Sequence, residues 1–396
     1  MTDRPTIRLR PKIDTRPLKR GFPWVYANQL VTDRRTRAIA PGTVVTLEDS
    51  ERTAIATATI NPASKIIARV LDPDTGIKID EDWLRAKIGR ALALREALYD
   101  APFYRLVHAE ADGLPGTIID RFGAALVVQP NAAWIDKLLP MLVPILAELT
   151  GATTILKNAQ GRARSLEGLD GISEILTGSL DGPVPVPMNG ATYMADLEGG
   201  QKTGFFYDQR PNHAFVANLS RGRSVLDVFS HVGGFGLAAL ANGASSALAV
   251  DGSSAALSLA EAGAAATGVA ERFTTRKGDA FDILAALAEG RKSFGSVICD
   301  PPAFAPSKSA REAGLRAYEK VARLAAPLVE PDGFLTLCSC SQAVDLTAFQ
   351  AASTRGLGRT GRRLQLLAIG EAGPDHPRLP VLAESGYLKS LTFRLS

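Results

Sequence analysis

Five short apolar runs, each followed by a helix-length stretch, constrain the fold of this 396-residue chain more than any other feature. Strands this apolar, spaced by helices, are typical of a parallel sheet that is covered on both faces. We therefore predict a doubly wound α/β domain, which binds ligands beyond the carboxyl ends of its strands. The predicted strands are Ser224–Phe229, Ala247–Asp251, Arg272–Thr275, Ser296–Asp300 and Phe334–Cys340.

The first half of the chain has a different pattern. Two β-rich runs bounded by turn residues, Gly42–Leu47 and Thr53–Ile60, predict a small N-terminal β-barrel. The turn-rich segment Asp72–Gly76 reads as a linker to a helix with its apolar positions at Trp83, Leu84, Ile88, Leu92 and Leu94.

A central α+β domain is expected to follow this helix. It would contain a helix over Ala133–Leu149 and the strands Gly116–Asp120, Ala125–Gln129 and Thr153–Leu156. The Pro-rich segment Gly182–Pro187 reads as a spacer before the α/β domain. We thus expect three domains, at residues 1–76, 77–188 and 189–396.

Composition excludes several classes of protein. With 46% hydrophobic and 22% charged residues the chain is ordinarily globular, and it has no internal repeat or heptad run. No apolar segment follows the basic N-terminus, and none reaches the roughly 18 residues of a membrane span. We therefore expect a soluble cytoplasmic protein with no membrane partner. Three cysteines without a CxxC pair favour neither a disulfide framework nor a zinc or other metal site.

The positive charge is concentrated at the N-terminus. Residues 1–37 hold ten Lys or Arg against three Asp, a local charge of +7, whereas the whole chain carries +4. Clustered basic residues suit the phosphates of a polyanion such as RNA, although a solvated basic tail explains them equally well. Arg16, Lys19 and Arg20 are the candidate contacts.

Acidic residues and glycines follow the predicted strands of the α/β domain, where its ligand should bind. Asp227 precedes a loop with Gly233, Gly234 and Gly236, and these glycines allow a close approach of the backbone to a ligand. Asp251 closes the second strand, where a carboxylate can accept the hydroxyls of a ribose. The third strand leads to Asp279 and Ala280, and the fourth to Asp300-Pro301-Pro302.

These acids distinguish between two nucleotide cofactors. A nicotinamide dinucleotide needs a G-x-G-x-x-G loop around its pyrophosphate, and acids are a poor lining for that group. They suit a cationic, amino-bearing ligand, so we favour S-adenosylmethionine over a nicotinamide cofactor.

The chain resembles the class I S-adenosylmethionine-dependent methyltransferases, and more closely the PUA-domain-containing family that methylates C5 of a cytosine in 23S ribosomal RNA. The resemblance spans nearly the whole chain. It rests on the segments Arg20–Tyr26, His108–Gly116, Asp120–Gly123, Gly200–Arg210, Gly233–Phe235, Asp300–Pro302, Ser339–Ser341 and Asp375–Pro377. It implies a PUA-like domain, a central domain and a Rossmann-like catalytic domain.

Cytosine C5 chemistry needs a nucleophile, because C5 attacks a sulfonium methyl only after a thiolate has added to C6. Cys338 and Cys340 share one face of the last strand, and Cys340 is nearer its carboxyl end. Cys340 also matches the Ser-Cys-Ser context of the family's nucleophile, so we expect it to be catalytic. Cys338 and Cys299 are expected in the core.

Further site residues follow from the proposed chemistry and from the resemblance. Asp300 would contact the extruded base with Pro301 and Pro302, Phe304 could stack on it, and Lys308 could meet RNA phosphate or simply be solvated. The cofactor would be bound by residues after the strands and in a lid-like motif: Asp227, Phe229, Gly233, Gly234, Asp251, Asp279, Ala280, Lys202, Thr203, Phe206, Asp208 and Arg210.

The chain departs from the family at a few positions. His231 and Val232 stand where an aromatic residue and Thr are common, and Pro211–His213 where another basic residue is common. Many RNA cytosine-C5 methyltransferases carry a second cysteine after the proline that this chain follows with Ala303. The base that removes the C5 proton is therefore open, with Asp300 or an ordered water as alternatives. We expect His108, Glu110 and Asp112 to serve substrate positioning or the fold.

Two other functions remain open. One is a methyltransferase acting on a nitrogen of guanine or adenine, for which the Asp300–Phe304 loop suffices without a thiol. The other is a noncatalytic RNA-binding or ribosome-assembly factor. The sequence leaves the oligomeric state undecided, with a homodimer as one alternative.

Overall fold

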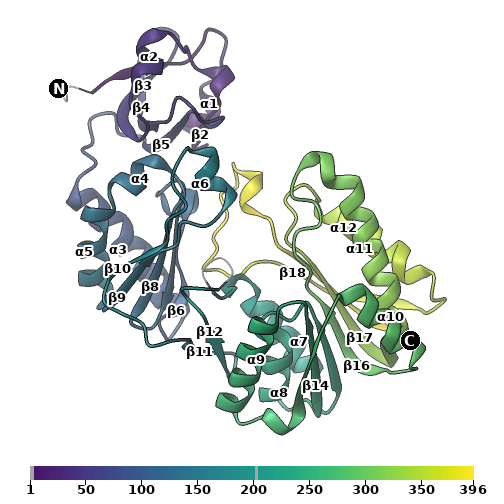
Figure 1. Cartoon of the computed structure of the whole chain (residues 1–396). Coiled ribbons are helices and arrows are strands. Elements are labelled where there is room, and N and C mark those ends of the chain that lie inside the picture. Colours follow the sequence, from purple (N-terminus) through teal and green to yellow (C-terminus); the bar gives the residue numbers. More distant parts are fainter. Residues whose placement is uncertain (1–3, 201–203) are drawn as a thin grey trace. The chain divides into compact units, whose positions relative to one another are not determined.

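The computed structural model describes residues 4–200 and 204–396, which divide into two compact units (Figure 1). The first unit comprises Met1–Asp181, Leu197–Gly204 and Pro374–Ser385, and the second comprises Gly182–Asp196, Phe205–Gly373 and Gly386–Ser396. Within the described residues, none of the helices has both the length and the apolar character needed to cross a membrane. The three-domain division stays a prediction.

The first unit begins with a five-stranded sheet in the order β1-β3-β4-β5-β2, around a small core that contains Val25, Leu30 and Val45. The two runs predicted to be strands are confirmed as β3 and β4. The elements are β1 (Thr6–Arg8), α1 (Arg16–Lys19), β2 (Trp24–Val25), η1 (Ala27–Gln29), α2 (Arg34–Ala38), β3 (Thr43–Glu48), β4 (Ala54–Ile60) and β5 (Ala68–Asp72).

A second five-stranded sheet, in the order β10-β9-β8-β7-β6, follows in the first unit. The three predicted strands are confirmed as β7, β8 and β9. The elements are α3 (Glu81–Leu98), β6 (Phe103–His108), η2 (Ala109–Asp112), β7 (Thr117–Phe122), β8 (Ala125–Pro130), α4 (Ala133–Lys137), α5 (Leu139–Thr150), β9 (Thr154–Lys157), α6 (Arg162–Leu166) and β10 (Glu174–Thr177).

Two helix predictions for this region need correction. The single helix predicted over residues 133–149 is two helices, broken at Leu138. Pro140 favours the break, because its ring would clash with the carbonyl four residues earlier and a proline fits best in the first turn of a helix, although α5 also holds Pro144 in its interior. In α3, Leu94 is exposed rather than buried, whereas Ala91 and Arg95 complete the buried stripe.

The second unit contains a seven-stranded sheet in the order β15-β14-β13-β16-β17-β19-β18. All five strands predicted for the α/β domain are confirmed, and the fold class is a Rossmann-like doubly wound domain. The strands are β13 (Ser224–Val228), β14 (Ser246–Asp251), β15 (Phe273–Lys277), β16 (Phe294–Cys299), β17 (Val329–Ser339), β18 (Leu364–Gly370) and β19 (Lys389–Leu395).

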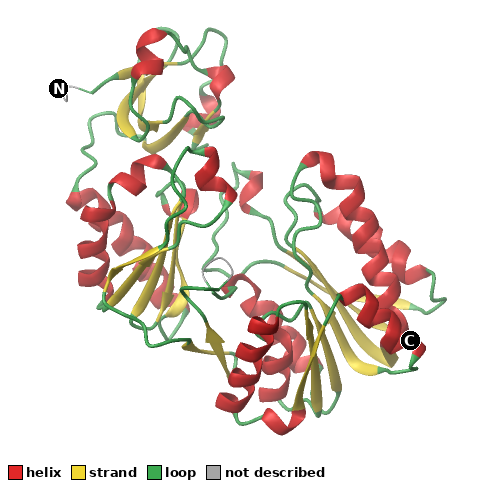
Figure 2. Ribbon diagram, in the orientation of Figure 1, coloured by secondary structure: helices red, strands yellow, loops and turns green. Residues whose placement is uncertain are grey.

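The sheet is mixed rather than wholly parallel. The strands from β15 to β17 are parallel, but β19 pairs antiparallel with both β17 and β18. Helices α7 to α9 pack on one another, as do α10 to α12, and Figure 2 shows the sheet between these two groups. The helices are η3 (Tyr207–Gln209), α7 (Arg210–Leu219), α8 (Gly234–Ala241), α9 (Ser254–Thr267), η4 (Ala270–Arg272), α10 (Ala280–Glu289), η5 (Lys308–Ala310), α11 (Arg311–Ala325), η6 (Ala326–Leu328) and α12 (Leu346–Gly358), with η7 (Ala383–Ser385) in the first unit.

The Pro-rich segment predicted as a spacer is instead one strand of a hairpin, β11 (Val184–Met188) paired with β12 (Ala191–Ala195). Pro185 and Pro187 pair with Met194 and Thr192, one and three positions beyond the hydrogen-bonded pair that flanks the two-residue turn. An N–H group at these positions would point away from β12, so the two prolines remove no hydrogen bond from the ladder. Asn189 and Gly190 both have positive φ, as the two-residue turn of such a hairpin requires.

Arg95 provides a test of the first unit's core. Its guanidinium is fully buried and donates to both oxygens of Asp112, at 2.7 and 2.8 Å. We expect Arg95→Met to lower the free energy of unfolding by about 3–5 kcal/mol, because the Asp112 carboxylate stays buried without its cation. The measurement is urea unfolding followed by Trp fluorescence, since all three tryptophans lie in this unit.

The matched control lies on the same helix. Arg85 pairs with Glu148 at the surface, where an ion pair contributes at most about 1 kcal/mol, so Arg85→Met should unfold nearly as the wild type does. Equal losses in the two variants would contradict a structural role for the Arg95 pair.

Candidate active site

Residues 229–233, named here the cofactor loop, connect β13 to α8 in a strained conformation. Phe229, His231 and Gly233 have φ angles of 63°, 50° and 80°. For residues other than glycine this left-handed region costs on the order of 1 kcal/mol or more, so the surroundings must hold the loop. Two predicted acids do so: Asp251 accepts from the His231 N–H at 2.9 Å, and Asp227 accepts from the Gly236 N–H at 2.8 Å.

Asp227 is fully buried at the end of β13. Burial, reinforced by the negative charge of Asp251, raises the pKa of its carboxyl group to about 7. Its Oδ1 has no hydrogen-bond partner in the described part of the chain, and neither has the buried Oγ of Ser230 in the cofactor loop. Buried polar atoms without partners are rare, so both atoms point to a ligand or to ordered water.

A small pocket lies at the cofactor loop, with about 340 Å³ of empty space that is partly open to solvent. Aromatic rings make up much of its wall, and Asp300 and Gln209 add polar groups. It is lined by Phe205, Phe206, Gln209, His213, Phe229, Ser230, His231, Val232, Gly234, Phe235 and Asp300. The structure thus brings the end of β13, the start of α8 and the Asp300 loop to one site.

A chain of buried amides orients Asp300. Gln209 Nε2 donates to Asp300 Oδ2 at 2.9 Å, and Gln209 Oε1 accepts from Asn212 Nδ2 at 2.7 Å. Asn212 Nδ2 also donates to the backbone carbonyl of Glu371, which fixes the direction of both amides. Gln209 and Asn212 were not predicted as site residues, although Gln209 lies in the family-like segment Gly200–Arg210.

The three cysteines differ in exposure as expected. Cys299 and Cys338 are fully buried, and burial raises the pKa of both thiols. Cys340 is half-buried just beyond the end of β17, with its Sγ 4.0 Å from the carbonyl oxygen of Pro301. The chain therefore has one accessible thiol, beside the loop that begins at Asp300.

The remaining residues of the Asp300 loop have different surroundings. Pro301 is buried, Pro302 is exposed, and Lys308 is exposed at the start of η5. The ring of Phe304 already packs against the rings of Tyr318, Phe281 and Phe229. Only the exposed part of Phe304 could therefore stack on a base.

Asp279 and Ala280 lie at the start of α10. The Asp279 carboxylate caps this helix by accepting from the N–H groups of Phe281 and Asp282, and Ala280 is buried. Asp251 also accepts from Ser253 N–H. Both acids thus have a local structural role in addition to the predicted cofactor contact.

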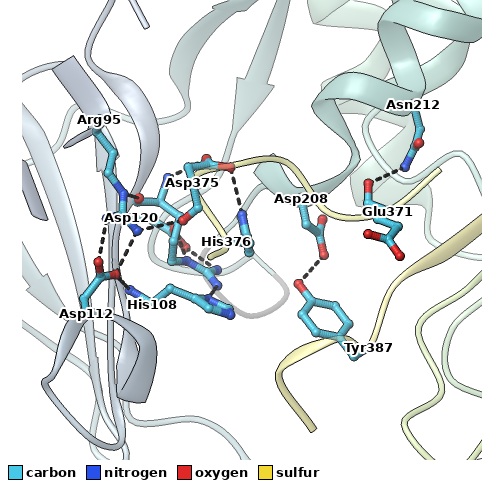
Figure 3. Close-up of polar contacts among 11 residues, drawn as sticks. Arg95, His108, Asp112, Asp120, Asp208, Asn212, Glu371, Asp375, His376 and Tyr387 are labelled. Atoms are coloured by element: carbon cyan, nitrogen blue, oxygen red, sulfur yellow. Dashed lines mark hydrogen bonds and ion pairs between the residues drawn. The ribbon is translucent and has the colours of Figure 1, made fainter. Parts of the chain in front are cut away.

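Of the lid-like motif, Lys202 and Thr203 lie outside the described residues. The Phe206 ring contacts the His231 ring at 5.0 Å, next to the pocket. Asp208 is nearly buried and accepts from the Tyr387 hydroxyl at 2.6 Å, as Figure 3 shows. The guanidinium of Arg210 lies over the ring of Tyr207.

A separate buried cluster belongs to the first unit. The fully buried Asp375 carboxylate accepts from the backbone N–H of Arg105 at 3.0 Å and pairs with His376, whose ring lies 5.0 Å from that of His108 (Figure 3). Burial, followed by the charges of neighbouring groups, lowers the pKa of His108 well below its usual value. This cluster supports a structural role for His108.

The other members of the predicted acid–base cluster are also engaged. Asp112 pairs with Arg95, and Glu110 accepts from the Trp24 indole and pairs with Arg69. At the N-terminus Arg16, Lys19 and Arg20 are all exposed, and Arg16 forms an ion pair with Asp14.

Comparison with known proteins identifies the family. Residues 7–73 match the model of a PUA-like domain, and residues 129–394 match that of the S-adenosylmethionine-dependent methyltransferases. The chain belongs to the S-adenosylmethionine-dependent methyltransferases. A "Ribosomal RNA large subunit methyltransferase" of Deinococcus radiodurans is 34% identical over 405 residues, covering 99% of this chain and 98% of the relative. A "Ribosomal RNA large subunit methyltransferase I" of Shewanella amazonensis is 34% identical, covering 98% and 99%.

Solved structures share the fold of this methyltransferase. A candidate SAM-dependent methyltransferase from Streptococcus mutans superimposes with a TM-score of 0.83 at 18% identity, over 98% of this chain and 100% of that chain. A candidate methyltransferase complexed with SAH also has a TM-score of 0.83 at 18% identity, over 98% and 99%.

S-adenosylmethionine is the cofactor of this family, and the residues at the pocket fit it. Asp227 Oδ1 at the end of β13 and Ser230 Oγ in the cofactor loop both lack a partner among the described residues, and acids near the loop suit a cationic ligand. Residue 234 has to be a glycine, because the Cβ atom of any other residue would lie 2.8 Å from the His213 ring. The predicted contacts of Phe229, Gly233, Gly234, Asp227 and Asp251 stay proposals.

The raised pKa of Asp227 predicts a pH-dependent stability. Between about pH 4 and pH 7 the folded protein keeps this proton while the unfolded chain, with a pKa near 3.8, releases it. The free energy of unfolding should therefore fall as pH rises through this window, by on the order of 4 kcal/mol. Asp227→Asn should lose this contribution, as measured by urea unfolding at pH 4 to pH 8 with circular dichroism. Parallel pH profiles for wild type and variant would refute the assignment.

Proposed function

We propose that this methyltransferase forms 5-methylcytosine in 23S rRNA of the large ribosomal subunit, with Cys340 as the nucleophile. The position of Cys340 carries this proposal: its thiol is the accessible one of three, and it lies beside Pro301 at the carboxyl edge of the sheet. The family motifs in this chain and the names of its relatives support rRNA as the substrate.

The proposed chemistry starts at C6 of the cytosine. The Cys340 thiolate forms an Sγ–C6 bond, and the electron pair displaced from the C5–C6 double bond makes C5 nucleophilic. Bound S-adenosylmethionine supplies the methyl group that C5 takes. The proton then leaves C5, and breakage of the Sγ–C6 bond restores the ring and the thiolate.

Asp300 is the proposed contact to the edge of the base, and Gln209 holds its carboxylate at the pocket. There it can hold or protonate N3, which favours addition at C6. Because Ala303 replaces the second cysteine of related enzymes, Asp300 or an ordered water would take the C5 proton. Pro301, Pro302, Phe304 and Lys308 are the proposed neighbours of the RNA.

A trapped adduct tests the nucleophile. RNA fragments of 23S rRNA containing 5-fluorocytosine should form a covalent complex with the protein and cofactor, because fluorine cannot leave C5 as a proton does. Peptide mapping should place the link on Cys340. Cys340→Ala should abolish both the adduct and methyl transfer, whereas Cys338→Ala, which removes a buried thiol, should keep both.

Other outcomes would point to the alternative functions. Methyl transfer by Cys340→Ala would favour a nitrogen of guanine or adenine as acceptor. No transfer to any RNA by the wild-type protein would favour a noncatalytic RNA-binding or ribosome-assembly factor.

We further propose that the PUA-like domain binds RNA phosphates through Arg16, Lys19 and Arg20. The affinity for rRNA fragments should fall by orders of magnitude between about 50 and 200 mM salt. Lys19→Ala/Arg20→Ala should reduce the slope of log affinity against log salt concentration by the contribution of about one to two phosphate contacts. The control Arg355→Ala/Arg359→Ala removes two exposed arginine side chains that pair with Glu319 on α11. An affinity that does not vary with salt would contradict the proposal.

A further inference from the structure

The hairpin β11–β12 contains none of the predicted site residues, yet hydrogen bonds connect it to the helices around the cofactor loop. We propose that Tyr193, on β12, is a positioning residue for S-adenosylmethionine. Its hydroxyl holds Gly234, and thereby the cofactor loop that precedes this residue.

The contact is a hydrogen bond made by a buried side chain. Tyr193 is fully buried, and its hydroxyl donates to the carbonyl oxygen of Gly234 at 3.0 Å. Gly234 is the first residue of α8 and directly follows the cofactor loop. Burial raises the pKa of the Tyr193 hydroxyl far above its usual value, so the group remains a donor at every pH at which the protein is folded.

The hairpin is fixed against α9. The backbone N–H of Thr192 donates to the hydroxyl of Thr267 at 2.9 Å. A Cβ at Gly263 would lie 3.1 Å from the carbonyl oxygen of Thr192 and 2.9 Å from the side chain of Leu237. Because residue 263 is glycine, α9 can approach the hairpin closely and keep Tyr193 in place.

The turn of the hairpin is fixed as well. Asn242, at the end of α8, donates to the carbonyl oxygen of Asn189 at 3.0 Å. The Asn189 side chain in turn donates to the carbonyl oxygen of Arg210 at the start of α7, at 2.8 Å. The hairpin is therefore tied to α7, α8 and α9, whose labels lie to the right of β11 and β12 in Figure 1.

His213 supports Gly234 from α7. Its ring lies 2.8 Å from the position that a Cβ of Gly234 would take, and it meets the Phe235 ring edge-on at 4.4 Å. Burial lowers the pKa of His213 to about 3, so the ring is neutral near pH 7. His213 acts on the loop by packing, and Tyr193 acts on it by a hydrogen bond.

The strained cofactor loop explains why such support affects binding. Phe229 and His231 hold left-handed conformations that a free loop would leave. If Gly234 loses its anchor, the cofactor must order the loop when it binds, and that cost reduces its affinity.

The test is the affinity for SAH, measured by isothermal titration calorimetry without RNA. Tyr193→Phe removes one oxygen atom and should weaken binding about 5- to 20-fold. In steady-state assays, the KM for S-adenosylmethionine should rise while kcat stays within about twofold of wild type. An SAH affinity within twofold of wild type would overturn the proposal.

Tyr104→Phe is the matched control. Tyr104 is equally buried, and its hydroxyl accepts from Arg121 in the first unit. This variant should lose stability and keep wild-type SAH affinity. If it weakened SAH binding as much as Tyr193→Phe does, general destabilisation would be the cause and the proposal would fail.

A second pair keeps the inference testable if Tyr193→Phe fails to fold. Thr267→Val removes the hydroxyl that accepts from the Thr192 N–H, so the hairpin loses this hydrogen bond to α9 while every aromatic side chain is kept. The variant should weaken SAH binding about threefold. Its control, Thr150→Val, removes a buried hydroxyl from α5 of the first unit. Equal SAH affinities in this pair would refute the role of the hairpin. None of these measurements depends on which RNA base is methylated.

Discussion

The hydrogen bond between the Asp227 carboxylate and the N–H of Gly236 joins the three parts from which the site is made. Asp227 ends β13, the strand that lies between β14 and β16 in the parallel part of the sheet. Gly236 belongs to the first turn of α8, and the cofactor loop spans the distance between them. Burying a carboxyl group is costly, and this bond offsets part of that cost while it fixes the direction in which the loop leaves the sheet.

Much of the second unit could be predicted because its central strands are buried on both faces. Such strands are continuous apolar runs, and β13, β14, β16 and the end of β17 all have this pattern. β19 was missed because its buried residues include Lys389, Ser390 and Thr392, so that it is not a continuous apolar run. β18 is largely apolar, but it is an edge strand that exposes Leu366, Leu367 and Ile369. The hairpin β11–β12 was missed because its prolines suggested a spacer, although the Asn189-Gly190 turn was a visible signal.

The placement of several candidate site residues was predictable from their positions along a strand. Acids at strand ends and the half-buried Cys340 follow from the direction and period of the strands, whereas their roles in binding and catalysis stay proposals. Gln209, Asn212 and Tyr193 could not be found in this way, because their importance comes from partners that are distant in sequence. The packing of Phe304 among other aromatic rings is likewise a property of the tertiary structure.

The path of the chain near its C-terminus limits how this architecture can be recombined. Residues 374–385 belong to the first unit, where Asp375 and His376 are buried, although residues on either side belong to the second. A fragment ending at Asp181 would lack these two side chains, and Arg95 would lose the carbonyl group of Asp375 that it binds. The two units are thus interleaved in sequence. An exchange of the first unit between relatives, in evolution or in the laboratory, must transfer this distant segment with it.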